Sequence, residues 1–231
     1  LFKKSFRNFF LYLILLIPSY DLSYHYDAGL YHLNYQALLR ENNIIFGISN
    51  IYGPYGIGSI YDYISAALWV DTTFVLLQFV NLIFIILFYE FLFNILFTKN
   101  NKLLNSAGLA LLIFSIIDNF GYGGGRNGFL YIQSLGKQDV ALAVLYFITA
   151  ILIFLCLSQK EYNSYDIFIP ALFSLFILQI KVSGATILLL YLFYLYKLVK
   201  DKRLEASSFF SIFPIIFLGI LWSLKSMLQT G

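Results

Sequence analysis

Apolar runs of helical length, separated by short polar segments, dominate the chain and predict membrane-spanning helices. A helix needs about 20 apolar residues to cross the hydrocarbon core of a bilayer. The run at 167–199 is too long for one crossing and is interrupted around Lys181, so we expect two short spans that turn at 181–184. The pattern therefore predicts an all-α bundle of about seven transmembrane helices. The apolar runs lie at residues 5–20, 72–97, 103–117, 140–157, 167–199 and 207–224.

The N-terminal run has two interpretations. Three basic residues precede a short apolar core at 9–17, which is also typical of a signal peptide. Because Pro18-Ser-Tyr-Asp follows instead of a small-residue cleavage site, we favour a retained span. The chain starts at Leu1 and stops just after an apolar segment, so we expect one transmembrane domain, 1–231, that is the N-terminal part of a longer protein.

The segment 20–71 is different from the rest, because it is rich in histidine, acids and tyrosine. Apolar residues recur at helical spacing over 28–42, and Asp27 stands in the N-cap position, which predicts an amphipathic helix at the membrane surface. Glycine and proline mark turns over 47–58, and a second short helix is expected at 59–70. The apolar stripe of the first helix consists of Leu30, Leu33, Ala37 and Leu38.

Composition and charge fit a membrane protein and give it an orientation. The chain is 60% hydrophobic and 12% charged, whereas soluble domains are roughly 25% charged. The single cysteine, Cys156, has no partner in the chain for a disulfide. With a cytoplasmic N-terminus, most basic residues fall on inner segments, as the positive-inside rule requires, and 20–71 is an extracytoplasmic loop. The inner basic residues are Lys3, Lys4, Arg7, Lys99, Lys102, Lys160, Lys197, Lys200, Lys202 and Arg203.

A first span followed by a long outer loop with an early acid, and a second acid at the outer start of the fourth span, resembles the GT-C class of polytopic glycosyltransferases. Residues 26–32 (YDAGLYH) and 45–58 are similar to a group of bacterial membrane proteins with a "DxGLYHL … GLANLHxRxGFNS" pattern. The chain departs from that pattern at Tyr52-Gly-Pro-Tyr, where the group has a His and an Arg. Later landmarks are Asp139 after Ser134-Leu-Gly-Lys, then Lys181-Val-Ser and Leu228-Gln-Thr-Gly.

The resemblance implies an enzyme of the inner membrane that moves a sugar from a polyprenyl-phosphate-linked donor to an acceptor on the extracytoplasmic face, in cell-envelope polysaccharide or glycolipid assembly. Such a reaction needs a carboxylate as base or as ligand of a divalent cation, Mg²⁺ or Mn²⁺, and cations for the leaving phosphate. Asp27 is the first candidate, also as the metal ligand, and Asp139 is the second. Each also has a structural interpretation, Asp27 as a helix cap and Asp139 as an acid favoured by the helix dipole.

Further residues are candidates for substrate binding, each with an ordinary alternative. His25 and His32 are seven residues apart and either bind a metal or form hydrogen bonds at the interface. Lys181 either contacts phosphate or extends to the lipid headgroups from a turn. Asp118 and Asp62 are weaker acid candidates, for which a solvated loop is favoured. The substrate-binding set is His25, Tyr31, His32, Arg126, Lys137 and Lys181.

Three other functions stay open. An O-antigen-type polymerase typically relies on outer-loop arginines, and this chain offers Arg40 and Arg126 there. A transporter or flippase of lipid-linked saccharides would have broken helices and an internal repeat, and no clear repeat is found. A non-catalytic scaffold is the third. The glycine-rich 123–125 lacks the Lys-Ser/Thr of a P-loop, and no basic stripe indicates nucleic-acid binding.

Overall fold

The computed structural model describes residues 9, 12–13, 15, 23–24, 27–42, 44–70, 76–96, 101–120, 134–135, 138–159, 163–203 and 206–231. Apart from one pair of two-residue strands, the secondary structure of these residues consists of helices and turns. The chain forms two compact units, which are described separately. The first unit comprises Leu1–Leu33 and Leu68–Val144, and the second comprises Asn34–Ala67 and Leu145–Gly231. The predicted all-α class is confirmed for the described residues.

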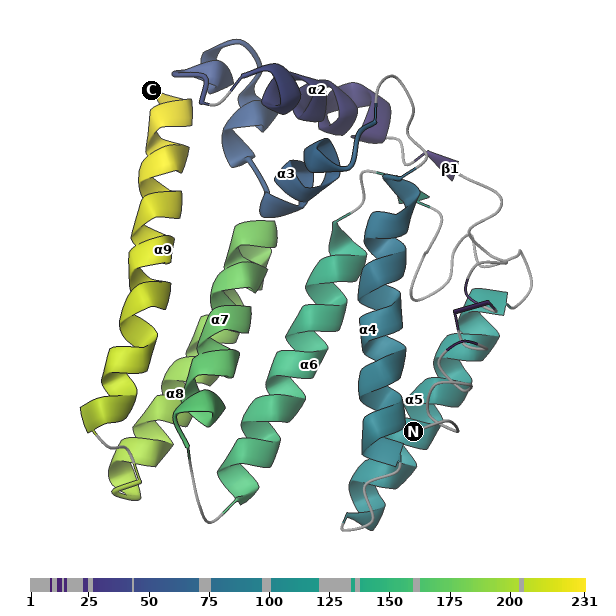
Figure 1. The fold of residues 1–231 in the computed structure, drawn as a ribbon, viewed down its shortest axis with the longest axis vertical. Helices are drawn as coiled ribbons and strands as arrows, with labels where there is room; N and C mark the ends of the chain where they lie inside the picture. Colours follow the sequence, from purple (N-terminus) through teal and green to yellow (C-terminus); the bar gives the residue numbers. More distant parts are fainter. Residues whose placement is uncertain are drawn as a thin grey trace. The chain divides into compact units, whose positions relative to one another are not determined.

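The first unit contains a pair of packed apolar helices, α4 (Gln78–Leu96) and α5 (Lys102–Phe120). They correspond to the runs expected at 72–97 and 103–117, and they lie side by side in Figure 1. Glu90, the acid inside the first of these runs, accepts a hydrogen bond from the Tyr12 hydroxyl at 3.3 Å. The apolar character of α4 fits its burial, because most of its side chains are covered, and the exposed apolar ones, Ile83 and Leu87, lie one helical turn apart. The buried ones include Ile85, Phe88, Tyr89 and Leu92.

The second unit contains the end of α6 (Asp139–Ser158) and three further helices, α7 (Ser164–Ile180), α8 (Thr186–Lys200) and α9 (Ala206–Thr230). The expected break of the long run 167–199 is confirmed: α7 ends at Ile180, and a 3-10 turn, Val182–Ala185, leads into α8. The core of the unit is built by Ile153, Cys156, Ile167, Ala171, Tyr191, Tyr194, Leu198, Ile212 and Ile215.

Hydrogen bonds define one end of the second unit, where the chain enters α7 and leaves α8. A capping box opens α7, in which Asn163 Oδ1 accepts from the Asp166 amide and the Asp166 carboxylate accepts from the Asn163 amide. The Tyr194 hydroxyl donates to the Asp166 carbonyl at 3.0 Å, and Arg203 Nη1 donates to the Gln159 carbonyl at 2.9 Å. These contacts hold the two connecting loops together.

The opposite end is covered by the segment that the sequence predicts as an outer loop. It contains α2 (Leu33–Glu41), two 3-10 turns (Ile48–Asn50 and Gly53–Ile57) and α3 (Ile60–Ala67), and Figure 1 shows these elements beside the C-terminal ends of α7 and α9. Ser59 Oγ donates to the Ile180 carbonyl at 2.6 Å, and Ser49 Oγ donates to the Thr230 carbonyl at 3.1 Å. The expected helix at 59–70 is therefore confirmed as α3.

The expected helix at 28–42 is also present, but its start differs from the prediction. A π-helical turn, Ala28–His32, precedes α2. Asp27 stands before this turn but makes no capping hydrogen bond. The physical reason is that the backbone of Asp27 already has helical angles, φ −68° and ψ −19°, whereas a capping residue is usually extended. The prediction of Asp27 as a side-chain cap is therefore wrong.

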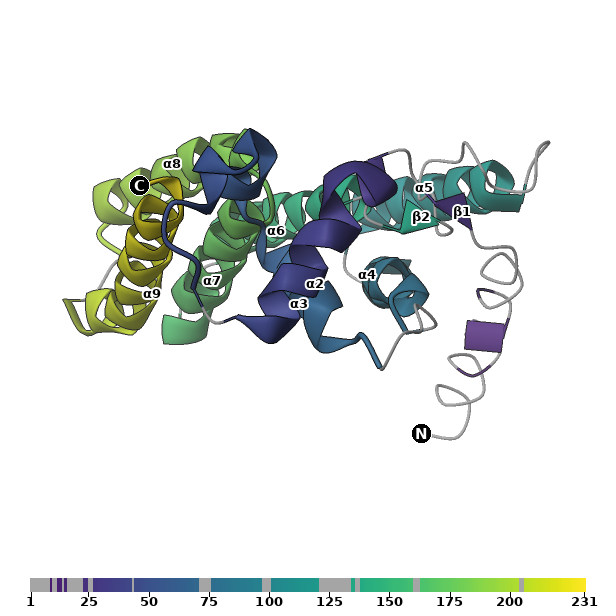
Figure 2. The ribbon, with the colours of Figure 1, turned by 90° about the horizontal axis from the view of Figure 1, so that it is seen from above.

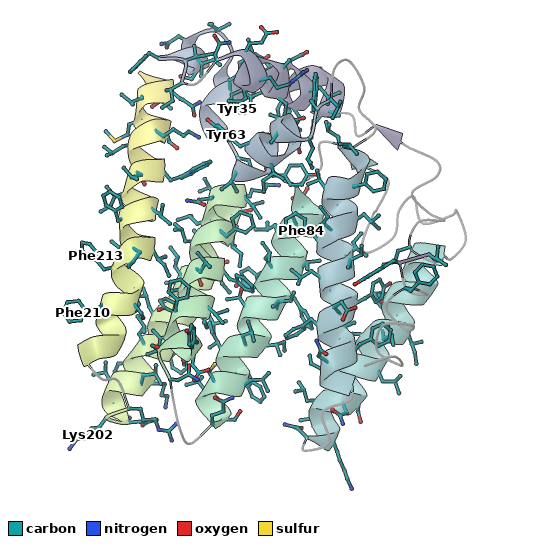
Figure 3. All side chains as sticks on the ribbon, viewed as in Figure 1. Tyr35, Tyr63, Phe84, Lys202, Phe210 and Phe213 are labelled. Carbon is teal, nitrogen blue, oxygen red and sulfur yellow. The ribbon has the colours of Figure 1, made fainter. Side chains whose placement is uncertain are left out.

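Three described helices are long and apolar enough to cross a membrane by length and composition: Asp139–Ser158, Val182–Lys200 and Phe210–Thr230. Three shorter apolar helices accompany them, Phe79–Ile95, Lys102–Ser115 and Ser164–Ile180. The first expected span, 5–20, lies mostly outside the described residues, so the count of seven stays a prediction. Along α9, Phe210 and Phe213 are exposed and point away from α7 and α8 in Figure 3, as lipid-facing side chains would.

The link between Ser59 and α7 generates a stability prediction. Ser59 is 4% exposed, and its Oγ also accepts from the Tyr61 amide, so Ser59→Ala leaves buried backbone groups unpaired. We expect a loss of about 1–3 kcal/mol, measured as a lower midpoint of thermal unfolding in detergent. Ser49→Ala is the matched control, because its bond to Thr230 is exposed and its loss should cost below about 0.5 kcal/mol. Equal midpoints for both variants would contradict the role of Ser59.

Candidate functional site

The two carboxylates predicted for catalysis follow a short parallel ladder in the first unit. Strand β1 (Ser23–Tyr24) pairs with β2 (Ser134–Leu135), with Tyr24 opposite Leu135, and Figure 2 shows the two strands side by side. Asp27 comes three residues after β1, and Asp139 comes four residues after β2. Parallel strands leave a ladder at the same end, so both acids follow that end within roughly 10–14 Å of chain.

The surroundings of Asp27 contain two of the predicted binding residues. Asp27 is half-buried, and Ala28–His32 forms the turn that follows it. His32 is buried, and its ring centroid lies 4.3 Å from that of Tyr31 at an interplanar angle of 41°. His25 lies outside the described residues, so its predicted partnership with His32 stays a prediction. Within the described ranges, no three His, Cys, Asp or Glu side chains gather as a metal site.

The other predicted residues lie in several places. Asp139 is the first residue of α6 and is half-buried, as an acid favoured by a helix N-terminus would be. Lys181 belongs to the second unit and joins α7 to the 3-10 turn with an extended backbone. Arg126 and Lys137 lie outside the described residues. Asp118 falls within α5, but its side chain is outside the described part of the structure.

Asp62 corrects an expectation. The sequence favours a solvated loop for this acid, but Asp62 lies in α3 and is only 4% exposed. Its Oδ1 accepts a hydrogen bond from Gln36 Nε2 of α2 at 3.0 Å. The helical repeat explains the difference, because a polar residue inside a short helix of the second unit can face another helix instead of water. Asp62 therefore joins α2 to α3 through a buried polar contact.

A group of side chains that sequence reasoning missed lies beside Asp62. We call it the Tyr–Lys cluster, and it consists of Tyr35, Tyr63, Trp222, Lys225 and Gln229. Gln229 Nε2 of α9 donates to the hydroxyls of Tyr35 and Tyr63 at 3.0 and 3.3 Å. Figure 3 shows Tyr35 and Tyr63 near the C-terminal end of α9. The cluster thus connects α2, α3 and α9 around one buried amide.

Lys225 is the only cation of this cluster, and aromatic rings surround it. Its Nζ lies 3.7 Å from the centroid of the Trp222 ring and 4.5 Å from that of Tyr63. Both Lys225 Nζ and Gln229 Oε1 are buried, and neither atom has a hydrogen-bond partner among the described residues. A buried donor and a buried acceptor without partners cost free energy of folding. The cluster therefore requires an explanation other than packing of the core.

Burial keeps the tyrosines of the cluster, and the neighbouring Tyr61, neutral. Burial raises the pKa of the Tyr35, Tyr61 and Tyr63 phenols, because an anionic phenolate loses its hydration there. The negative charge of Asp62 raises the pKa of Tyr61 further. Ordinary phenols already have a pKa near 10. These hydroxyls therefore act as hydrogen-bond donors and acceptors at physiological pH, not as bases.

Two signals in the sequence point to the cluster. Lys225 directly follows the last predicted apolar run, 207–224. Gln229 lies in Leu228-Gln-Thr-Gly, one of the landmarks of the resemblance. Neither signal could identify Tyr35 or Tyr63 as partners, because these residues lie 194 and 166 positions before Gln229 in the chain.

The space around Gly58 generates a prediction. A Cβ atom on Gly58 would lie 2.6 Å from Tyr35 Oη, 3.1 Å from Gln229 Oε1 and 3.2 Å from Lys225 Nζ. Gly58→Ala should therefore lower stability by about 1–3 kcal/mol through overpacking, measured by thermal unfolding in detergent. Gly53→Ala is the control, because nothing lies within 4 Å of its Cβ position. An unchanged midpoint for Gly58→Ala would contradict this close approach.

Comparison with known proteins gives one family. Residues 2–231 match the family described as "Domain of unknown function (DUF8201)". A search of the curated proteins finds no match, and a search of the solved structures finds none. Because the family match covers nearly all of the sequence, the chain belongs to the DUF8201 family.

Proposed function

We propose that this protein is a membrane glycosyltransferase of the GT-C type, which moves a sugar from a polyprenyl-phosphate-linked donor to an acceptor on the extracytoplasmic face. Cell-envelope polysaccharide or glycolipid assembly is the process that this reaction would serve. The observation that carries the proposal is the β1–β2 ladder, because it directs Asp27 and Asp139 from the same end of one short sheet. Asp27 and Asp139 are 112 residues apart in the chain (139 − 27), yet each follows one of two strands that pair with each other.

The chemistry assigns a role to the first acid. The Asp27 carboxylate accepts the proton of the acceptor hydroxyl while that oxygen attacks the anomeric carbon of the donor sugar. The bond between the anomeric carbon and the phosphate oxygen breaks, and the polyprenyl phosphate leaves with the electron pair. Asp27 is half-buried, so it is positioned by its surroundings while part of it stays accessible.

Asp139 is the second carboxylate of the proposal, and it acts by orienting the acceptor or by holding a cation. Carboxylate oxygens are the ligands that Mg²⁺ and Mn²⁺ prefer, so Asp27 and Asp139 fit such an ion chemically. Within the described ranges, no group of three or more His, Cys, Asp or Glu side chains is found. The proposed proton transfer is assigned to Asp27. Arg126, Lys137 and Lys181 remain the candidates for contacts with the leaving phosphate.

The distribution of charge supports an extracytoplasmic loop and a cytoplasmic N-terminus in the inner membrane. In the second unit, α8 ends at Lys200 and is followed by Arg203, which contacts the loop before α7. The predicted outer loop covers the other ends of α7 and α9 through Ser59 and Ser49. The positive-inside rule assigns the basic end to the cytoplasm, which leaves the loop outside.

Substitution of the two acids tests the proposal. Membranes that contain the full-length protein are supplied with labelled polyprenyl-phosphate sugars, and the initial rate of sugar transfer is measured at matched expression. Asp27→Asn should lower the rate by about 10²-fold or more, because removal of a general base typically costs 10²–10⁴-fold. Asp139→Asn should also lower the rate. Asp201→Asn is the control, because Asp201 is exposed after α8.

The outcomes separate the alternatives. Equal rates for the wild type and both acid variants would remove Asp27 and Asp139 from the mechanism. Failure of every labelled donor with well-folded wild-type protein would overturn the glycosyltransferase proposal and favour the polymerase or the transporter. Loss of transfer in the Asp201 variant as well would indicate a general effect on folding instead of a catalytic one.

A further inference from the structure

An apolar pocket lies in the second unit between α7 and α9, and the Tyr–Lys cluster stands at one end of it. The pocket has a volume of about 520 Å³, within the roughly 300–1,000 Å³ typical of ligand sites. Its walls are almost entirely apolar, and Lys225 is the only charged residue that lines it. Lining residues include Leu172, Phe176, Leu218, Leu221, Trp222 and Lys225.

The polar end of the pocket has unused hydrogen-bonding capacity of both kinds. Lys225 Nζ has three N–H donors without an acceptor, and Gln229 Oε1 is an acceptor without a donor. Both atoms lie just over 3 Å from the Cβ position of Gly58, but Tyr35 Oη lies 2.6 Å from the same point, so that point leaves no space for a ligand. Lys225 also lines the pocket, so an anionic oxygen that enters the pocket would satisfy the ammonium.

We propose that the pocket binds an anionic phospholipid, with one chain between α7 and α9 and the phosphate at Lys225. The apolar walls fit a hydrocarbon chain and would not fit a free sugar or nucleotide. The ammonium supplies the charge that an anion needs, and it reaches the phosphate by rotating about its flexible side chain away from the Trp222 and Tyr63 rings. This site is separate from the chemistry proposed for Asp27 and does not depend on it.

Asp62 is the charge that opposes this assignment, because its carboxylate acts on the same cluster. However, Asp62 accepts a hydrogen bond from Gln36, and Lys225 Nζ has no hydrogen-bond partner among the described residues. The ammonium thus keeps its N–H donors available for a phosphate oxygen. The net negative charge of the headgroup distinguishes the expected lipid from phosphatidylcholine, whose choline cation neutralises the charge of its phosphate.

Trp222 offers a direct measurement, since it lines the pocket and is one of only two tryptophans. In a Trp69→Phe background in phosphatidylcholine nanodiscs, Trp222 fluorescence is titrated with phosphatidylglycerol that carries brominated chains, which quench on contact. Phosphatidylcholine with the same brominated chains is the comparison. We expect roughly tenfold or more preference for phosphatidylglycerol, because a charge-assisted hydrogen bond is gained.

Variants of Lys225 test the cause of the preference at constant ionic strength. Lys225→Gln should lose the preference for phosphatidylglycerol, whereas Lys225→Arg should keep it, since the charge is retained. Lys200→Gln is the matched control, because Lys200 is an exposed cation at the end of α8. Each titration is normalised to the same variant in lipid without bromine, which corrects for direct effects of Lys225 on the indole.

Three results would overturn the proposal. Equal quenching by the two brominated lipids in the wild-type background would exclude selectivity for an anion. An unchanged preference in Lys225→Gln would remove Lys225 from the site. Reversal of quenching by inorganic phosphate at matched ionic strength would indicate a site for the free anion instead of the lipid. Persistent quenching in the presence of inorganic phosphate supports the lipid.

Discussion

The carbonyl groups at the C-terminal ends of apolar helices are the constraint on which the second unit depends. The last carbonyls of any helix lack partners within it, and an unpaired polar group is costly where water is scarce. The segment 47–59 supplies the missing donors: Gly47 N–H to the Leu228 carbonyl at 3.0 Å, Ser49 to Thr230 and Ser59 to Ile180. Hydrogen bonds therefore attach this segment to the ends of α7 and α9.

This attachment explains how a short loop can position a polar cluster. Once Ser59 is bound at the end of α7, α3 begins at Ile60, and Tyr63 lies within reach of α9. Two residues of α2 complete the network. The Tyr35 hydroxyl accepts a hydrogen bond from Gln229, and Gln36 donates one to Asp62. Each buried polar side chain joins two elements, so the network fixes one arrangement of α2, α3 and α9 more strictly than apolar packing would.

The sequence predicted the helices and the turn at Lys181 well, because apolar periodicity and interrupting charges are local signals. It also located α3. It did not predict that Asp27 lacks a capping bond or that Asp62 is buried, since these depend on backbone angles and on partners elsewhere in the chain. The Tyr–Lys cluster was missed for the same reason. The β1–β2 register lies equally beyond local patterns, because Ser23 and Ser134 are paired across 111 residues (134 − 23).

The retention of a lysine at position 225 requires an explanation in terms of free energy. A charged residue at the centre of a membrane helix costs about 2.5–3.5 kcal/mol on insertion scales, and less toward the interface. Two aromatic faces return about 2 kcal/mol when the ammonium is desolvated, and Asp62 adds an attraction through space. The charge itself is thus compensated only in part. The unused N–H donors are not compensated, because ring faces do not replace hydrogen bonds to water. An apolar residue in this position would avoid that residual cost, so the cost is best explained by an oxygen-bearing group that shares the pocket.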